Sequence, residues 1–136
     1  MLIFYPIVLR IYSFIISLCA LFNDKAKDFI EGRKEQETDI DKWAAKNKSS
    51  QKIWIHSASL GEYEMSKPMI AILRSSFPNV KFILSFYSPS GYNYASYEKE
   101  DLKIYLPIDF YNRQNKLIEK LQPRAVIFIK YEFWYN

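Results

Sequence analysis

The chain has 136 residues, of which 49% are hydrophobic and 18% aromatic, so it has enough apolar side chains for the core of one domain and is not wholly disordered. Its net charge of +4 suits an anionic partner, but the basic residues are scattered and no nucleic-acid-binding motif occurs, which argues against nucleic acid as a partner. The single cysteine, Cys19, and the single histidine, His56, exclude an internal disulfide and disfavour a Cys/His zinc site.

The amino terminus contains a long apolar stretch, LIFYPIVLRIYSFIISLCALF, which predicts a membrane-anchor helix over residues 1–22. About 20 apolar residues span a bilayer as a helix. Arg10 interrupts the stretch at a cost of about 2.5–3.5 kcal/mol, but its apolar neighbours outweigh this cost and it lies near enough to one end to snorkel. A tilted span and a helix lying in the interface both fit. A secretory signal fits less well, because no basic residues precede the stretch and no small-residue cleavage site follows it.

The next segment, residues 23–51, is polar and charged, which predicts a solvated helix or linker. Four basic residues near the anchor would keep this flank, and the body after it, on the cytoplasmic side of the membrane: Lys25, Lys27, Arg33 and Lys34. Four apolar residues in the segment offer contacts to the body or to the membrane surface: Phe29, Ile30, Ile40 and Trp43.

From Lys52 onward, short apolar runs alternate with segments of helical periodicity. The apolar runs predict strands at 52–57, 80–86, 102–108 and 125–131. The periodic segments predict helices at 64–77 and 110–122, and the segment 88–100 opens with turn residues and then permits a helix. This alternation is typical of βαβ units, so the sequence predicts an α/β fold with a parallel sheet covered on both faces.

Active sites of such sheets lie beyond the carboxyl ends of the strands. Four segments follow the predicted strands directly: SASLGE, SPSG, PIDF and EFWYN. They would place five polar residues along one rim of the sheet: Glu62, Ser88, Ser90, Asp109 and Glu132.

Glu62 allows two interpretations that do not exclude each other. Ser59 and Glu62 match the S-x-x-E pattern of a capping box, in which each side chain accepts from the other's backbone N–H. Alternatively, Gly61 lets a substrate approach the backbone closely, the N–H groups at the helix start hold an anion or a hydroxyl oxygen, and the Glu62 carboxylate accepts a proton from a sugar hydroxyl.

Four motifs occur in a fixed order along the chain: HSASLGE at 56–62, FYSPSG at 86–91, YLPIDF at 105–110 and EFWYN at 132–136. Together with the apolar amino terminus and the Gly32-Arg33-Lys34 stretch, this ordered set resembles the Kdo transferases of lipopolysaccharide assembly. These enzymes move 3-deoxy-D-manno-oct-2-ulosonic acid (Kdo) from CMP-Kdo to a lipid A precursor. The similarity covers the whole chain, although Lys130 stands where many members have an acid and Tyr135 where most have proline.

The resemblance implies a GT-B glycosyltransferase built of two Rossmann-like domains, with residues 52–136 forming the domain that takes the lipid A precursor. It implies that Glu62 is the general base of an inverting transfer that needs no metal or other cofactor. It also implies a place at the inner (cytoplasmic) membrane, with the catalytic domain facing the cytoplasm. The candidate substrate-binding residues are Ser59, Gly61, Ser88, Ser90, Gly91 and Glu132. For the SPSG segment, a turn with a helix cap is an equal alternative.

The sequence stops at Asn136, about where the acceptor half of such an enzyme would end. The carboxyl-terminal domain that would bind CMP-Kdo is therefore expected to lie elsewhere, and the isolated chain is expected to be inactive. The alternative function is a non-catalytic, membrane-tethered module that binds an anionic lipid or a partner. Half of a nucleotide-binding oxidoreductase is disfavoured, because no G-x-G-x-x-G follows a predicted strand.

Overall fold

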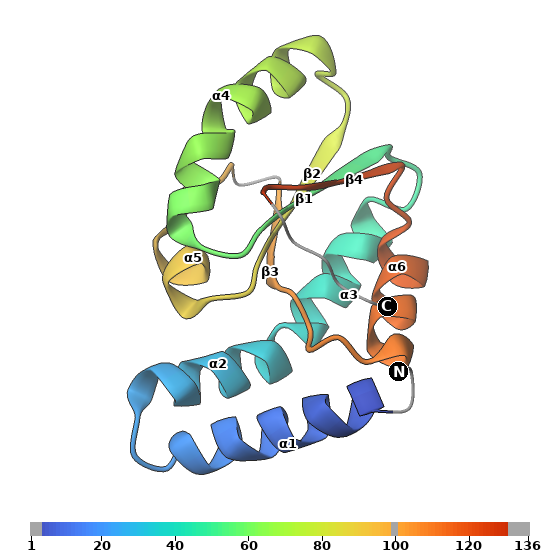
Figure 1. Cartoon of the computed structure of the whole chain (residues 1–136). Coiled ribbons are helices and arrows are strands. Elements are labelled where there is room, and N and C mark those ends of the chain that lie inside the picture. Colours follow the sequence, from blue (N-terminus) through green and yellow to red (C-terminus); the bar gives the residue numbers. More distant parts are fainter. Residues whose placement is uncertain (1–3, 99–100, 131–136) are drawn as a thin grey trace.

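The computed structural model describes residues 4–98 and 101–130, and its centre is a four-stranded parallel sheet (Figure 1). The strands are β1 (Lys52–Ser57), β2 (Lys81–Phe86), β3 (Leu102–Tyr105) and β4 (Ala125–Phe128), in the order β3-β2-β1-β4. Each neighbouring pair is parallel, and the longest register runs from Lys52 opposite Lys81 to Ser57 opposite Phe86. The predicted α/β fold with a parallel sheet is confirmed, and its arrangement is consistent with a Rossmann-like domain.

Helices cover both faces of the sheet, as the apolar strands predict (Figure 1). Helices α4 (Leu60–Ser76) and α5 (Pro89–Tyr94) pack on one face, and α3 (Glu37–Lys46) and α6 (Tyr111–Leu121) on the other. Successive strand residues point to opposite faces. Trp54 therefore joins the core under α3 and α6, whereas Ile55 joins the core under α4 and α5.

The polar segment 23–51, for which the sequence predicts a solvated helix or linker, is helical and is partly buried against the body. It forms α2 (Asp24–Glu35) and α3, which meet at Gln36. Ile40 of α3 is buried in the sheet core, with Trp43 and Ala44 packed beside it. These three residues are spaced i, i+3 and i+4, so they form one apolar face on a helix whose other residues are mostly polar.

The amino-terminal apolar stretch contains α1 (Phe4–Cys19), which lies beside α2 (Figure 1). Its 16 residues make a helix of about 24 Å, which is shorter than a hydrocarbon core of about 30 Å. Within the described residues, no single helix has the length and apolarity needed to cross a membrane. Only α1 and α2 taken together meet that measure, and they are bent by 119° at the break between them.

The outer edge of β3 is paired by a side chain rather than by another strand. The Gln36 Nε2 amide donates to the Tyr105 carbonyl at 2.9 Å, and the Tyr105 N–H donates to Gln36 Oε1 at 2.7 Å. One amide group thus satisfies both backbone groups of the last strand residue. The same contact brings Gly32 of α2 against the Tyr105 ring, where a Cβ atom would overlap Cε2 of that ring.

We expect Gly32→Ala to lower the free energy of unfolding by about 1–2 kcal/mol, although alanine is the better helix former. The reason is that the Tyr105 ring is almost fully buried and stacks on Tyr92 at 4.0 Å, so it cannot move aside cheaply. Urea denaturation of the full chain measures the effect. Gly61→Ala is the matched control, because a Cβ atom there meets nothing within 4 Å and should cost no stability. Equal stability of the Gly32→Ala variant and the wild type would contradict the close contact.

Candidate functional site

The loops that follow β1 and β2 lie side by side at the carboxyl edge of the sheet. The Ser88 N–H donates to the Ala58 carbonyl at 2.9 Å, which joins the two loops directly. The SASLGE and SPSG segments, which are about 30 residues apart in the sequence, are therefore neighbours in space. The structure thus brings together Glu62, Ser59, Ser88 and Ser90 at one corner, as the sequence predicts.

Glu62 takes part in a complete capping box at the start of α4. The Ser59 N–H donates to Glu62 Oε2 at 3.1 Å, and the Glu62 N–H donates to Ser59 Oγ at 3.4 Å. The capping interpretation is confirmed. The carboxylate accepts the Ser59 N–H through Oε2 alone, and Oε1 accepts no hydrogen bond from any residue that the structure describes. Since the side chain is half-buried, it remains accessible from solvent.

The surface around Gly61 is open. Gly61 is exposed, and a Cβ atom built on it would meet no atom within 4 Å apart from its chain neighbours and the backbone of its own helix turn. Its backbone is in the first turn of α4, where N–H groups point out of the helix end and the helix dipole favours negative charge. The side chains of residues distant in the sequence therefore leave the backbone at Gly61 open to a substrate oxygen.

In the SPSG segment, two of the three candidate residues have structural roles. Ser88 caps α5, because its Oγ accepts from the Gly91 N–H at 3.2 Å. Gly91 is buried, and a Cβ atom there would lie 2.6 Å from Cδ1 of Phe86, so this position holds α5 close to β2. Ser90 is exposed, and its Oγ lies 3.0 Å from that of Ser88. Ser90 is thus the hydroxyl of this segment that an external ligand reaches most easily.

Asp109 follows β3 as expected, but it does not lie on an open rim. Its side chain is fully buried, and Oδ2 accepts a hydrogen bond from the Tyr5 hydroxyl of α1 at 2.6 Å. Helix α1 therefore closes this part of the edge, which corrects the expected exposure of Asp109. The predicted residue Glu132 and the rest of the EFWYN motif lie outside the described residues.

Arg33 of α2 is a central residue of this edge, and its role was not recognised in the sequence. Its guanidinium donates to three backbone carbonyls: those of Leu106 at 2.9 Å, Tyr87 at 2.7 Å and Phe29 at 2.8 Å. The Phe29 ring lies 3.6 Å from the guanidinium carbon, and the rings of Tyr87 and Tyr105 are also near. Burial lowers the pKa of Arg33 to about 10, so the group is still a cation at neutral pH.

Arg33 thereby fixes the loops after β2 and β3 to the amino-terminal helices. Tyr87 and Leu106 are the first residues after those strands, and both carbonyls accept from the same guanidinium. The Gly32-Arg33-Lys34 stretch was the available signal in the sequence. Nothing local, however, indicates that its arginine contacts residues 54 and 73 positions later in the chain.

His56 is a packed residue under the sheet rather than a ligand at the rim. Its side chain is fully buried, and Nδ1 lies 2.8 Å from Ser85 Oγ, which also accepts from Trp54 Nε1 at 2.6 Å. Burial lowers the pKa of His56 to about 4, so the imidazole is neutral at pH 7. Among the residues that the structure describes, no group of three or more His, Cys, Asp or Glu side chains is placed to hold a metal ion.

Comparison with known proteins gives one family. The family model described as 3-deoxy-D-manno-octulosonic-acid transferase (kdotransferase) matches residues 32–136. A bifunctional glycosyltransferase/methyltransferase of Fusobacterium nucleatum is 27% identical over 118 residues, which cover 83% of this chain and 17% of the relative. The 3-deoxy-D-manno-octulosonic acid transferase of Haemophilus influenzae is 28% identical over 63% of this chain and 21% of its own length. That of Chlamydia trachomatis serovar D is 31% identical over 60% of this chain and 20% of its own length.

The chain thus spans about a fifth of the length of these curated relatives. No solved structure matches it. The matched residues 32–136 contain all four ordered motifs, from HSASLGE to EFWYN, and also Arg33.

Buried His56 predicts a pH-dependent stability. Its pKa is about 4 in the folded chain against 6.5 for an ordinary histidine, so the unfolded chain binds the extra proton between these values. The free energy of unfolding therefore falls as the pH decreases through this window, by about 2–3 kcal/mol between pH 7 and pH 4.5.

Urea denaturation at these two pH values, compared between wild type and His56→Asn, isolates this contribution from that of the carboxyl groups. The asparagine side chain keeps an acceptor for the Ser85 hydroxyl but has no group that titrates in this range. The same loss of stability on acidification in both proteins would show that His56 is not the cause.

Proposed function

The chain belongs to the Kdo transferase family, and we propose that it forms the acceptor-side half of a GT-B enzyme that transfers Kdo from CMP-Kdo to a lipid A precursor. The family match and the names of the curated relatives support this proposal, which includes a glycosyltransferase role in lipopolysaccharide biosynthesis. The chain spans only about a fifth of the length of those relatives, and we propose that its residues contribute the acceptor side of the enzyme.

The observation that supports the proposal most directly is that the two oxygens of Glu62 have different roles. Oε2 accepts from the Ser59 N–H, which fixes the orientation of the carboxylate at the start of α4. Oε1 accepts from no described residue, the side chain is half-buried rather than enclosed, and the neighbouring Gly61 is exposed. A carboxylate that is held by one oxygen and accessible at the other is suited to accept a proton from a bound hydroxyl.

In the proposed reaction, Glu62 Oε1 takes the proton of an acceptor hydroxyl as its oxygen attacks the anomeric carbon of Kdo. The bond between that carbon and the phosphate oxygen of CMP breaks, and CMP leaves with the electron pair. Attack opposite to the leaving group inverts the configuration. Glu62 is a weak base, but the departing phosphate supplies most of the driving force, so this mechanism requires no metal or other cofactor.

The other candidate residues divide into two groups. Gly61 and Ser90 are exposed, and we propose that they contact the acceptor directly. Ser59, Ser88 and Gly91 build the two helix starts that hold Glu62 and Ser90, so we propose that they position these groups. Glu132 stays a candidate for substrate binding.

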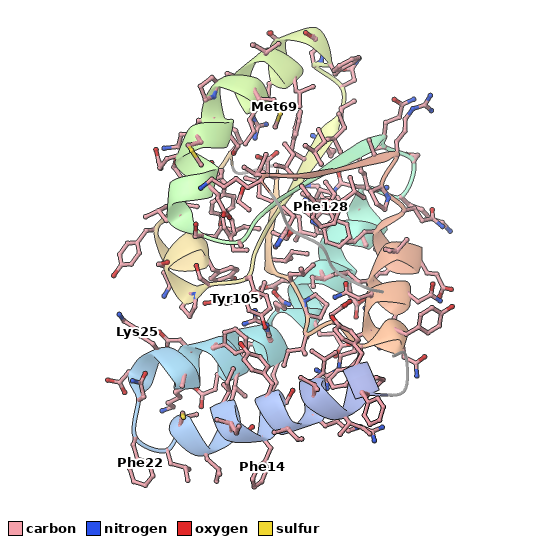
Figure 2. All side chains as sticks on the ribbon, viewed as in Figure 1. Phe14, Phe22, Lys25, Met69, Tyr105 and Phe128 are labelled. Carbon is pink, nitrogen blue, oxygen red and sulfur yellow. The ribbon has the colours of Figure 1, made fainter. Side chains whose placement is uncertain are left out.

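We also propose that α1 lies in the interface of the cytoplasmic membrane, with the body on the cytoplasmic side. Large apolar side chains cover the outer face of α1 and are 45–70% exposed: Phe4, Ile7, Val8, Ile11, Phe14, Ile15 and Leu18. Figure 2 shows Phe14 and Phe22 directed away from the rest of the molecule. A helix whose inner side contacts the protein body and whose outer side is apolar and exposed fits the plane of an interface. Lys25 and Lys27 at the start of α2 favour the cytoplasmic leaflet.

Replacement of the proposed base gives the most direct test. In the full-length enzyme, Glu62→Gln should reduce the transfer of Kdo to a lipid A precursor by at least about a hundredfold. Folding should be unchanged, because glutamine also completes a capping box. Transfer is measured with CMP-Kdo and purified acceptor, and folding by thermal unfolding.

Glu64→Gln is the matched control for this experiment. Glu64 is on the same helix turn but is exposed and paired with Lys67 at 2.7 Å, so its replacement should leave transfer almost unchanged. Near-normal transfer by Glu62→Gln would limit Glu62 to its capping role and would refute the proposed mechanism.

The membrane location is tested by extraction. We expect the chain to remain with membranes in high salt, and the double variant Ile11→Asp/Phe14→Asp to be released, because both side chains project from the outer face of α1. Ile72→Asp/Phe77→Asp, which changes two exposed apolar residues of α4 and its end, is the control and should stay bound. Release of the wild-type chain by salt alone would indicate a purely electrostatic association instead.

A further inference from the structure

A cavity of about 720 Å³ lies between α1, the corner of α2 and α3, and α6. It is separate from the site at Glu62, because it borders the α3 and α6 side of the sheet whereas α4 covers the opposite face (Figure 1). Its apolar walls come from all of these elements and from the loop after β3, and include Ile16, Ile30, Ile40, Pro107, Ile108 and Leu117.

The charges around this cavity are strongly unbalanced. Its lining contains six basic residues and one acidic residue, Glu37: the basic residues are Arg10, Arg33, Lys34, Arg113, Lys116 and Lys120. Lys116 is paired with Glu37 at 2.9 Å, and Lys120 with Asp41. Among the residues that the structure describes, Arg33 contacts neutral carbonyl groups and aromatic rings and no acidic side chain.

The three remaining cations, Arg10, Lys34 and Arg113, have no acidic partner among the described residues. They come from α1, α2 and α6, so three helices contribute positive charge to the lining of one cavity. All three residues are exposed, so water solvates them in the free chain, and an anionic group that enters the cavity can replace this water. The cavity therefore has the chemistry of a site for an anionic amphiphile.

Helix α1 connects the cavity to the proposed membrane surface. The side that lines the cavity contains Arg10, Ser13, Ile16 and Ser17, whereas the outer side is apolar and exposed. Both serine hydroxyls donate to carbonyls of their own helix, at Leu9 and Ser13, so Arg10 is the charged group that α1 presents here. An interfacial helix buries its apolar side about 5–10 Å into the boundary of the acyl chains, which leaves its opposite side at the level of the phosphates.

We propose that this cavity binds the headgroup of an anionic membrane phospholipid of the phosphatidylglycerol type. The lipid phosphate accepts hydrogen bonds from Arg10, Lys34 and Arg113, since charge-assisted bonds to phosphate are the strongest that these side chains form. The glycerol backbone packs on the apolar wall, and the acyl chains pass along the exposed face of α1 into the bilayer.

The lipid in this cavity is not the acceptor of the proposed transfer. The reacting hydroxyl must reach Glu62 at the start of α4, while the cavity lies under α3 and α6, on the other side of the sheet. The inference rests only on the membrane location proposed above and not on the catalytic mechanism. A bound phospholipid would set the orientation of the body on the membrane, so that the Glu62 edge meets the bilayer at a fixed angle.

Lipid retention tests this inference on the full-length chain in neutral maltoside micelles. Equal amounts of phosphatidylglycerol and phosphatidylcholine are added, and native mass spectrometry measures which lipid stays bound. We expect phosphatidylglycerol to be retained at least about tenfold more than phosphatidylcholine, because only the former leaves a net negative charge for the three cations. Equal retention of the two lipids would overturn the proposal.

The variant Lys34→Gln/Arg113→Gln should lose phosphatidylglycerol at least about tenfold, since it removes two of the three proposed phosphate ligands. Lys42→Gln/Lys46→Gln is the matched control: it makes the same change in net charge at two exposed residues of α3 outside the cavity lining, and should retain the lipid within about threefold of wild type. Equal losses in both double variants would show a diffuse electrostatic effect and no site.

Two further measurements are needed. One distinguishes a lipid phosphate from free phosphate, and the other distinguishes the lipid site from the catalytic site at Glu62. A large excess of inorganic phosphate should not displace phosphatidylglycerol, whereas displacement would indicate a site for free phosphate. Glu62→Gln should retain the lipid like wild type, and loss of the lipid from this variant would contradict the separation of the two sites. Because no donor or acceptor sugar is present, failure of the catalytic proposal would leave this result unaffected.

Discussion

The arrangement of the carboxyl edge depends on the partly buried guanidinium of Arg33. A cation taken out of water must be compensated by acceptors, and here three backbone carbonyls and a facing Phe29 ring provide them. Two of these carbonyls belong to the residues that follow β2 and β3. The hydrogen bonds of one guanidinium therefore hold both loops against α2. The loop after β2 in turn contacts the loop after β1, because the Ser88 N–H donates to the Ala58 carbonyl.

The second feature of this edge is that one side chain combines a structural and a proposed chemical role. In many helices a capping carboxylate is fully explained by the cap. At Glu62 the cap uses only one of two oxygens, and the exposed glycine beside it leaves room for a substrate. Capping therefore helps the proposed catalysis, because a carboxylate that is already oriented loses less conformational freedom when a substrate binds.

Helix α1 separates two environments of the molecule. Its inner side contacts the body through Tyr5 and Asp109 and borders the basic cavity, and its outer side exposes apolar groups. This division explains how Arg10 fits into an otherwise apolar stretch, because it lies on the cavity side of the helix. If both proposals hold, the Glu62 edge and the cavity beside α6 would be oriented against the same membrane by one helix.

The sequence by itself determined the features that arise from neighbours in the chain. Alternating strand and helix patterns predicted the parallel sheet, and the spacing of Ser59 and Glu62 predicted the capping box, because hydrogen bonds between residues i and i+3 are encoded locally. Only the tertiary structure decided that α3 belongs to the core and that Tyr5 covers Asp109, 104 residues later. It also decided that Arg33 binds the carbonyl of Leu106, 73 residues away, and that cations of three helices line one cavity. Such contacts depend on how the helices pack around the sheet, and no local period or spacing records which distant carbonyl, hydroxyl or charge will meet.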